Sequence, residues 1–150
     1  MQVEKANTND AEAILALQKL AYLSEAELHD DFEIPPLTQT LVQLIAEFDV
    51  KRVLKIVNNG SIIACGQVYM QQECCHISRM AVHPNFQGKG LGAALMSALE
   101  NQFPQAERYE LFTGNNSTRN LSMYQRRGYV PFKEALLGKT KVIFLRRNNV

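Results

Sequence analysis

The stretch of sequence most suited to chemistry is a glycine-rich segment at residues 87–92, which reads QGKGLG. It follows a largely apolar run at residues 77–82. The segment contains Leu91, and Leu95 and Leu99 follow it at the spacing of one helix face. A strand that leads through a glycine-rich loop into a helix directs several backbone N–H groups and the positive end of the helix dipole toward one point. The glycines let a ligand approach the main chain closely. The segment therefore predicts a binding site for a phosphate or pyrophosphate.

Two other phosphate-binding motifs fit this segment less well. The nucleoside-triphosphate loop G-x-x-x-x-G-K-[ST] needs a glycine where the chain has His83 and a hydroxyl residue where it has Gly90. The dinucleotide motif G-x-G-x-x-[GA] is met by Gly88, Gly90 and Ala93. However, the ribose-binding acid of that motif ends the second strand, whereas Glu110 would begin one. The first motif is excluded, and the second lacks the structural context that it requires.

Two spaced motifs resemble the GNAT superfamily of N-acetyltransferases. The first, Q-x-x-G-x-G at residues 87–92, follows residues 80–84 (MAVHP) and is similar to the acetyl-CoA pyrophosphate loop of that family. The second lies at residues 117–129 and resembles the family segment N-x-x-x-Y-x-x-x-G-[FY]. The two motifs have the order typical of the family, and together they cover residues 76–132. The resemblance implies the GNAT fold and acyl transfer from acetyl-CoA.

The resemblance also implies which residues bind the cofactor. The backbone of the run before the loop would pair with the pantetheine arm, and an N–H near Met80 would polarise the thioester carbonyl. The glycine-rich loop would bind the pyrophosphate, where the exposed Lys89 either adds a charge or remains solvated. Asn120 would hydrogen-bond the cofactor arm, or be an exposed helical asparagine. The implied set is Met80, Ala81, Val82, Gln87, Gly88, Lys89, Gly90, Leu91, Gly92 and Asn120.

Tyr124 is the candidate general acid, because it occupies the tyrosine position of the family motif. A phenol with an ordinary pKa near 10 is neutral at pH 7 and can give a proton to a departing thiolate. The alternative is an aromatic side chain packed on the buried face of an amphipathic helix, three residues after Leu121.

His76 is the candidate general base, which must remove a proton from the acceptor amine. Many relatives carry glutamate in this strand, so the chain departs from the common pattern here. The same role could be taken by a water relay or by one of four other side chains, Glu73, Glu25, His29 and Glu33. A purely structural histidine at the start of a strand is the alternative to a catalytic one.

The acidic stretch at residues 24–36 (SEAELHDDFEIPP) borders the acceptor site in the family. Its carboxylates would attract a cationic amine, and a solvated acidic loop is the alternative. The candidate substrate-binding residues are Glu25, His29 and Glu33. Pro35 and Pro36 would prevent a helix from continuing through the end of this stretch.

Composition places the chain among ordinary globular proteins. Its 150 residues are the size of one domain, 46% are hydrophobic, and the net charge of +1 attracts neither nucleic acid nor membranes. No long apolar span or signal peptide is evident, so a cytoplasmic location is expected. The three cysteines have no C-x-x-C spacing, which predicts reduced thiols and no metal site.

The predicted elements give an α/β (α+β) fold. They form a mixed, mostly antiparallel sheet of about seven strands with helices on both faces. Residues 51–57 and 61–71 should pair as a hairpin through the turn Asn58-Asn59-Gly60, and residues 109–113 should return parallel after a helical crossover. Further helices are expected after residues 7–10, from about Thr38, and from residue 117 to 127.

The sequence thus predicts a single N-acetyltransferase domain over residues 1–150 that acetylates a primary amine of a small molecule by direct attack in a ternary complex. Two alternatives remain: transfer to a peptide or protein amine, and a non-catalytic module that binds an acyl-CoA or a dinucleotide. A homodimer is plausible by resemblance alone. The acceptor itself is not specified, because this family uses one fold for many amines.

Overall fold

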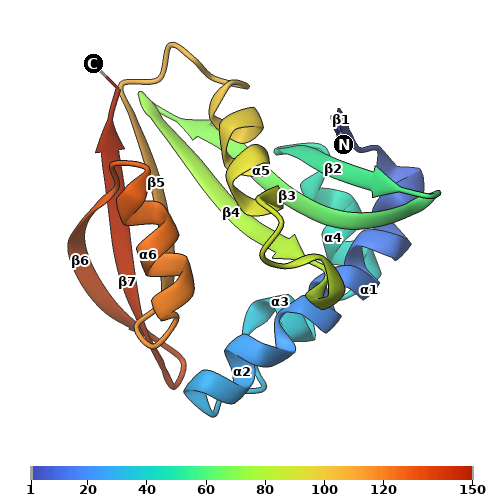
Figure 1. The fold of residues 1–150 in the computed structure, drawn as a ribbon, viewed down its shortest axis with the longest axis horizontal. Helices are drawn as coiled ribbons and strands as arrows, with labels where there is room; N and C mark the ends of the chain where they lie inside the picture. The colour runs from blue at the N-terminus through green and yellow to red at the C-terminus, as the bar shows by residue number, and fades with distance from the viewer. Residues whose placement is uncertain (1, 150) are drawn as a thin grey trace.

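The computed structural model describes residues 2–149 and contains a seven-stranded sheet with the order β1-β2-β3-β4-β5-β7-β6 (Figure 1). The strands are β1 (Val3–Lys5), β2 (Arg52–Asn58), β3 (Ser61–Gln71), β4 (Cys74–Val82), β5 (Arg108–Gly114), β6 (Val130–Leu137) and β7 (Thr140–Asn148). The α-helices are α1 (Ala11–Ala21), α2 (Leu23–His29), α3 (Pro35–Thr38), α4 (Leu41–Glu47), α5 (Leu91–Glu100) and α6 (Thr118–Arg126). Two short 3-10 helices are η1 (Thr8–Asp10) and η2 (Pro84–Phe86).

Strands β4 and β5 form the only parallel pair among the described residues, and their pairing is short. It joins residues 74–76 to residues 108–110, after which the two strands diverge and leave a V-shaped opening (Figure 1). All other neighbouring strands are antiparallel. The structure therefore confirms the predicted mixed, mostly antiparallel sheet.

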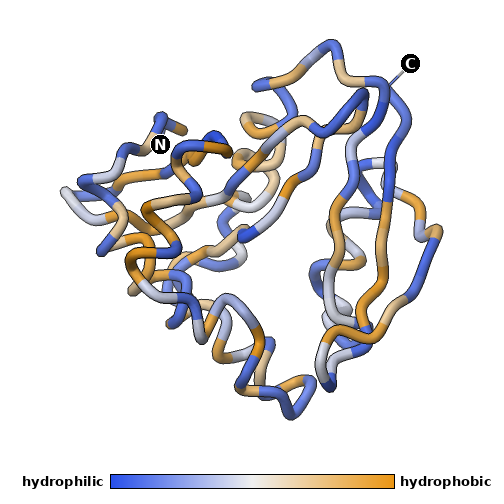
Figure 2. Tube along the Cα trace, turned by 180° about the vertical axis from the view of Figure 1, so that it is seen from behind, coloured by the Kyte–Doolittle hydropathy of each residue, from blue (hydrophilic) through white to orange (hydrophobic). Residues whose placement is uncertain are grey.

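Helices pack on both faces of the sheet, as predicted. Leu95 and Leu99 of α5 lie in the larger apolar core, which continues to Leu145 of β7. Ile14 of α1 and Leu44 of α4 belong to a second core on the opposite face. Seen from behind, the chain carries hydrophobic segments on both sides of the opening (Figure 2). The opening thus lies between two walls, each supported by its own apolar packing.

The hairpin between β2 and β3 forms as the sequence predicts. Asn58 pairs with Ser61, and the two residues between them have positive φ, 52° at Asn59 and 78° at Gly60. These values suit asparagine and glycine and match the twist of the strands that they join. The parallel return of β5 beside β4 is also confirmed.

The acidic stretch at residues 24–36 is more helical than its sequence suggests. Most of α2 falls inside it, although Ala26 is the only buried residue of that helix. Pro35 begins α3, because the first residue of a helix needs no N–H donor. The expectation that the two prolines forbid a helix at the end of this stretch is therefore wrong, because α3 begins there. Helix α4 begins at Leu41, with Thr40 as its N-cap, slightly later than predicted.

Candidate functional site

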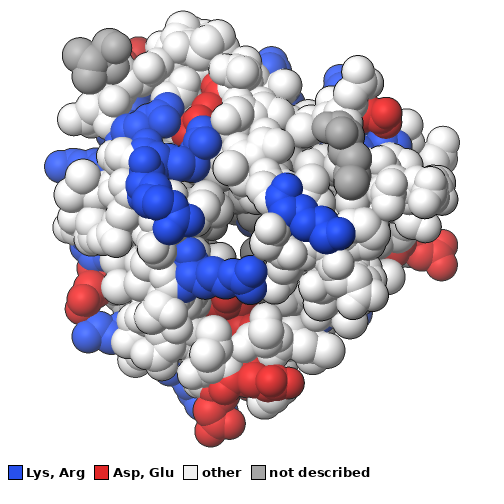
Figure 3. All heavy atoms as spheres, in the orientation of Figure 1, with Lys and Arg blue, Asp and Glu red and all other residues white. Residues whose placement is uncertain are grey.

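A cleft of about 940 Å³ occupies the opening between β4 and β5 and extends to both sides of the sheet. Its walls come from α2, α3, the loop before α5, and α6, together with strands β3 to β7. Figure 3 shows Lys and Arg side chains gathered around a hollow at the centre of the face seen in Figure 1. The cleft is therefore a positively bordered site at the point where the sheet is incomplete.

The glycine-rich loop forms one border of this cleft. Gly88 and Gly90 have φ values of 76° and 79°, a left-handed conformation that a glycine adopts without strain. Gly90 is also the N-cap of α5 and leaves the first turn of that ten-residue helix without a side-chain cap. A Cβ at Gly90 would meet no heavy atom within 4 Å, so the space beside the loop is open. Uncapped amides beside open space suit the phosphates of coenzyme A.

An arginine of α6 extends this border. The Arg119 guanidinium donates a hydrogen bond of 3.0 Å to Oε1 of Gln87. It also lies 3.8 Å from the position that a Cβ would take at Gly88. Arg119 and Arg126 both line the cleft and add positive charge on the side of α6. This charge complements a pyrophosphate at the loop.

Strand β4 contains a bulge next to the loop. Cys65 of β3 pairs with Ala81 and Gln67 pairs with Ser78, so that two residues of β4 oppose one residue of β3. One of the two, Arg79, has a left-handed φ of 55°. A bulge bends a strand and redirects its backbone groups, which is common beside functional sites. Here it turns β4 away from β5, where the cleft opens.

Tyr124 lies at the inner end of α6 and lines the cleft, although only 6% of its surface is exposed. Its ring packs 6.2 Å from the ring of Tyr129. Burial raises the pKa of the Tyr124 phenol, and the negative charge of Glu25 adds to this shift. The phenol is therefore protonated at neutral pH and can act as a proton donor.

His76 lines the cleft from β4, half-buried, and stacks on Tyr69 with ring centroids 5.0 Å apart. Burial lowers its pKa below the ordinary value, which Glu110 opposes and Arg108 supports. The imidazole is therefore neutral near pH 7 and can accept a proton.

Glu110 is the β5 partner of His76 in the strand register. Its carboxylate accepts a hydrogen bond of 2.6 Å from Arg108 and one of 3.2 Å from the Cys74 thiol. Burial acts to raise the Glu110 pKa, but these two hydrogen bonds lower it. Ligand atoms of Cys74, His76 and Glu110 lie within 4.8 Å of one another, a grouping that cysteine spacing alone did not predict. The carboxylate already has Arg108 as its partner.

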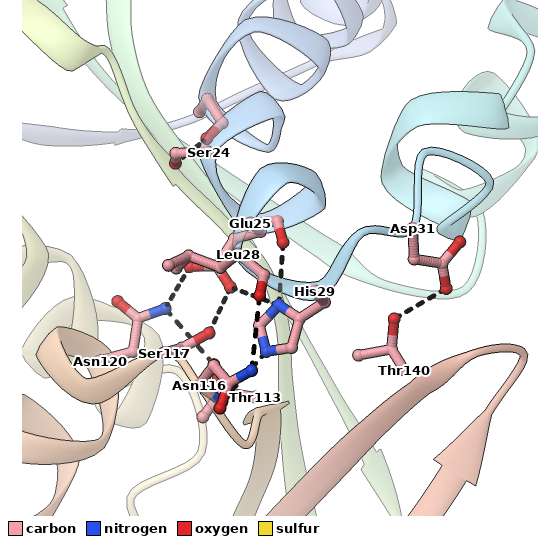
Figure 4. A network of polar contacts seen from close by, with 11 residues as sticks. Ser24, Glu25, Leu28, His29, Asp31, Thr113, Asn116, Ser117, Asn120 and Thr140 are labelled. Atoms are coloured by element: carbon pink, nitrogen blue, oxygen red, sulfur yellow. Dashed lines mark hydrogen bonds and ion pairs between the residues drawn. The ribbon is translucent and has the colours of Figure 1, made fainter.

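A polar network closes one end of the cleft by joining α2 to α6 and β5 (Figure 4). The Glu25 carboxylate accepts hydrogen bonds from the Ser117 hydroxyl and, at 3.3 Å, from the Asn120 amide. Nε2 of His29 accepts a hydrogen bond of 3.1 Å from the backbone N–H of Asn116. A Cβ at Gly114 would overlap the His29 ring, so the glycine allows this close approach. Helix α2 is thus held mainly by polar contacts.

Most of the predicted site residues line the cleft, and two do not. The lining set includes Tyr124, His76, Met80, Ala81, Val82, Gln87, Gly88, Gly90, Leu91, Gly92, Asn120, Glu25 and His29. Lys89 is outside it, with its ammonium 5.6 Å from the ring centroid of Phe86. Glu33 also lies outside the lining set. The Asn120 amide, which does line the cleft, donates hydrogen bonds to Glu25 and Thr113. The binding roles of these residues stay predictions.

Many residues that line the cleft were not among the candidates from the sequence, and Tyr22, Arg79 and Phe112 are three of them. Tyr22 comes from the junction of α1 and α2, Arg79 from the bulge and Phe112 from β5. Arg79 carries the only local signal, since it is a cation within an otherwise apolar run. Tyr22 and Phe112 reach the cleft through the packing of α2 and the strand order, which no local pattern specifies.

No helix within residues 2–149 has the length and apolar character that a membrane span requires.

Comparison with known proteins adds sequence relatives. Residues 13–129 match the acetyltransferase (GNAT) family. The UPF0157 protein YqkA of Bacillus subtilis is 30% identical over 119 residues, which cover 79% of this chain and 34% of that protein. An amino-acid acetyltransferase of Edwardsiella ictaluri is 27% identical over 93% of this chain and 29% of that protein. The chain thus spans about a third of the length of these curated relatives.

Solved structures show the same fold. A Streptococcus mutans protein, smu.2055, superposes with a TM-score of 0.85 at 13% identity, covering 100% of both chains. The PaiA N-acetyltransferase of Thermoplasma acidophilum, in complex with coenzyme A, gives a TM-score of 0.78 at 12% identity, covering 99% of both. These matches confirm the predicted fold, and the family uses acetyl-CoA as its acyl donor. With more than half of its length matched by the family profile, this chain belongs to the GNAT acetyltransferase family.

Proposed function

We propose that this chain is an acetyl-CoA-dependent N-acetyltransferase that acts on the primary amine of a small molecule. The observation that carries the proposal is the composition of one cleft, which combines an uncapped glycine-rich loop, a buried phenol and a half-buried imidazole. Among similar proteins, one relative is named an amino-acid acetyltransferase and one structural neighbour is a spermidine N-acetyltransferase chimera. Both names describe transfer to small amines.

The cofactor would enter between β4 and α6. Bound acetyl-CoA supplies the acetyl group, which forms a bond to the amine nitrogen while the carbon–sulfur bond breaks and CoA leaves as a thiol. The amides around Gly88, Gly90 and Gly92, with the Arg119 guanidinium, would hold the pyrophosphate. The free edge of β4 beyond His76 offers N–H and C=O groups to the cofactor arm.

Tyr124 would donate the proton that the departing sulfur takes. Its high pKa keeps the proton on the phenol until negative charge develops on the sulfur. Within residues 2–149 no hydrogen bond of the protein contributes to its pKa, so the hydroxyl is available to a ligand. His76 would take the proton lost by the amine, either directly or through one water molecule. His76 lies on strand β4 and Tyr124 on helix α6, so a directly attacking amine could lie between the two side chains.

A second candidate is transfer to the amine of a peptide. Two structural neighbours are ribosomal-protein-alanine N-acetyltransferases, from Escherichia coli and Brucella melitensis, with TM-scores of 0.74 each. The network between α2 and α6 closes one end of the cleft, which favours a small acceptor over an extended chain. A binding module without catalysis is the remaining alternative.

A screen of amines that measures released CoA with a thiol-reactive dye tests the proposal. Small primary amines should release CoA and yield an N-acetyl product with the mass of one added acetyl group. Peptides with free N-termini should react more slowly than the best small amine. Binding of acetyl-CoA without CoA release for any amine would contradict the transferase assignment and favour the binding module.

A further inference from the structure

The acceptor side of the cleft lies on the sheet face opposite α5 and α6. Cys75 and Ile77 of β4 belong to the core under α5, so His76 between them points to the other face. The same alternation places Glu110 and Phe112 of β5, and Phe144 of β7, on this face. We call these side chains, His76, Glu110, Phe112 and Phe144, the acceptor face. All of them line the cleft.

The two carboxylates that line the cleft in the described chain already have partners. Glu110 is paired with the Arg108 guanidinium at 2.6 Å. Glu25 accepts hydrogen bonds from Ser117 and Asn120. The charge of Glu110 is thus neutralised by a cation of the protein, and part of the hydrogen-bonding capacity of Glu25 is already used. Of the acidic residues that the sequence offered as a cation site, Glu25 accepts hydrogen bonds inside the protein and Glu33 lies outside the cleft.

A cation at the bulge has no ion-pair partner among residues 2–149. Arg79 is half-buried and lines the cleft, and no carboxylate of residues 2–149 forms an ion pair with it. The hydroxyl of the preceding residue, Ser78, is buried in the cleft wall without a hydrogen-bond partner. Leaving a half-buried charge or a buried hydroxyl without a partner costs free energy. Together they point to an anionic group of a ligand, and a guanidinium binds a carboxylate through two parallel hydrogen bonds.

The outer part of the acceptor face is aromatic. The Phe112 ring is 47% exposed and lies 5.2 Å from the Phe144 ring. Lys133, another lining residue, places its ammonium 4.3 Å from the centroid of Phe144. The exposed Phe112 ring, packed beside the half-buried Phe144 ring inside the cleft, offers a surface for an apolar or aromatic side chain.

We propose, on the basis of the proposed transferase function, that the acceptor is an apolar α-amino acid. Arg79 and Ser78 would bind its carboxylate, Phe112 and Phe144 would contact its side chain, and His76 would face its amine. This combination disfavours a polyamine, which has no carboxylate. It also disfavours the N-terminus of a peptide, whose first residue has an amide in place of the carboxylate.

The test compares kcat/KM for four acceptors: L-phenylalanine, phenethylamine, L-alanine and spermidine. The kcat/KM of L-phenylalanine should exceed that of phenethylamine, which lacks only the carboxylate, by about 10- to 100-fold. This factor corresponds to the free energy of a hydrogen bond to a charged group. The kcat/KM of L-phenylalanine should also exceed that of L-alanine, which lacks only the ring. Arg79→Gln should bring the ratio of L-phenylalanine to phenethylamine close to 1, and Arg79→Lys should restore part of it. Phe112→Ala should reduce the ratio of L-phenylalanine to L-alanine.

Arg52→Gln is the matched control, because Arg52 is an exposed cation outside the cleft and should leave both ratios unchanged. Thermal unfolding of each variant would show whether it is folded. CoA release that is fastest with spermidine or phenethylamine would overturn this inference while leaving the transferase in place. Equal loss for both amines in Arg79→Gln would also overturn it. The absence of CoA release with every acceptor would contradict the transferase, and the inference with it.

Discussion

The hydroxyl of Tyr124 can be removed without disturbing the fold, which makes Tyr124→Phe a clean test of its chemistry. The ring is 6% exposed and packs in the larger core, so phenylalanine keeps nearly all of the apolar contact. No protein hydrogen bond contributes to the Tyr124 pKa within the described residues, so the substitution removes none. The melting temperature should therefore change by no more than about 2 °C.

The effect on turnover should be much larger. Proton transfer by a positioned side chain contributes roughly 100- to 10,000-fold to a rate. Water in the open cleft can replace part of this, so we expect kcat to fall by about 10- to 100-fold. The dissociation constant of coenzyme A should stay nearly constant, because the phenol acts as a donor only when charge develops on the sulfur.

Tyr129→Phe provides the matched control, because the Tyr129 ring packs beside the Tyr124 ring with centroids 6.2 Å apart. Its hydroxyl donates a buried hydrogen bond of 2.7 Å to the Glu100 carboxylate, on the side of the helix that faces the core. Loss of a hydrogen bond to a charged group costs about 1.5 to 3 kcal/mol, which corresponds to a fall in melting temperature of roughly 3 to 12 °C. Its kcat should remain near that of the unmodified chain.

The assay is CoA release under saturating substrates, combined with calorimetric titration of coenzyme A and thermal unfolding. The two tyrosines should give opposite results: turnover falls for one variant and stability falls for the other. An unchanged kcat in Tyr124→Phe would refute the assignment of the proton donor. A large loss of stability in the same variant would show instead that the hydroxyl has a structural role.

Three further results are expected. At saturating acceptor, kcat should be constant near pH 7 and fall in more acidic solution with a midpoint below 6.5, because the lowered pKa of His76 keeps its imidazole neutral until then; in His76→Gln this fall should disappear. Gly114→Ala should lower the melting temperature by several degrees because a methyl group would overlap the His29 ring, and a thermal double-mutant cycle with His29→Ala should show that the two losses are not additive. Arg119→Gln should weaken coenzyme A binding by about 10-fold in calorimetric titration, since its guanidinium holds Gln87 at the border of the phosphate loop.

Local sequence patterns predicted the elements whose structure is decided locally. The Asn58-Asn59-Gly60 turn formed because asparagine and glycine tolerate positive φ, and that property needs no tertiary partner. The glycine-rich loop and the start of α5 also agree with the sequence, because Gly90 adopts the positive φ that a glycine permits, while the binding of a phosphate there stays a prediction. Tyr124 and His76 were found through a family motif and a strand position, and both line the cleft.

The parts that the sequence did not predict depend on distant contacts. Helix α2 buries only Ala26 and so lacks the apolar stripe that marks a helix. It is held by Glu25 and His29, whose partners lie about 90 positions away in sequence, with separations of 92 and 87 residues. The pairing of Phe112 with Phe144 likewise depends on β7 inserting between β5 and β6. Periodicity cannot reveal such neighbours.

The short pairing of β4 with β5 leaves residues 77–82 as a strand edge inside the molecule. On an outer surface, such an edge recruits other chains and promotes aggregation. Here the walls of the cleft and the polar network that joins α2 to α6 shield this edge, so we expect little room for a whole polypeptide strand to add. We expect that a slender molecule with amide groups at strand-like spacing would need less room there than a polypeptide strand. The unpaired edge of β4 would thus select ligands: it would bind a molecule whose amide groups resemble those of a backbone, and it would exclude a polypeptide strand.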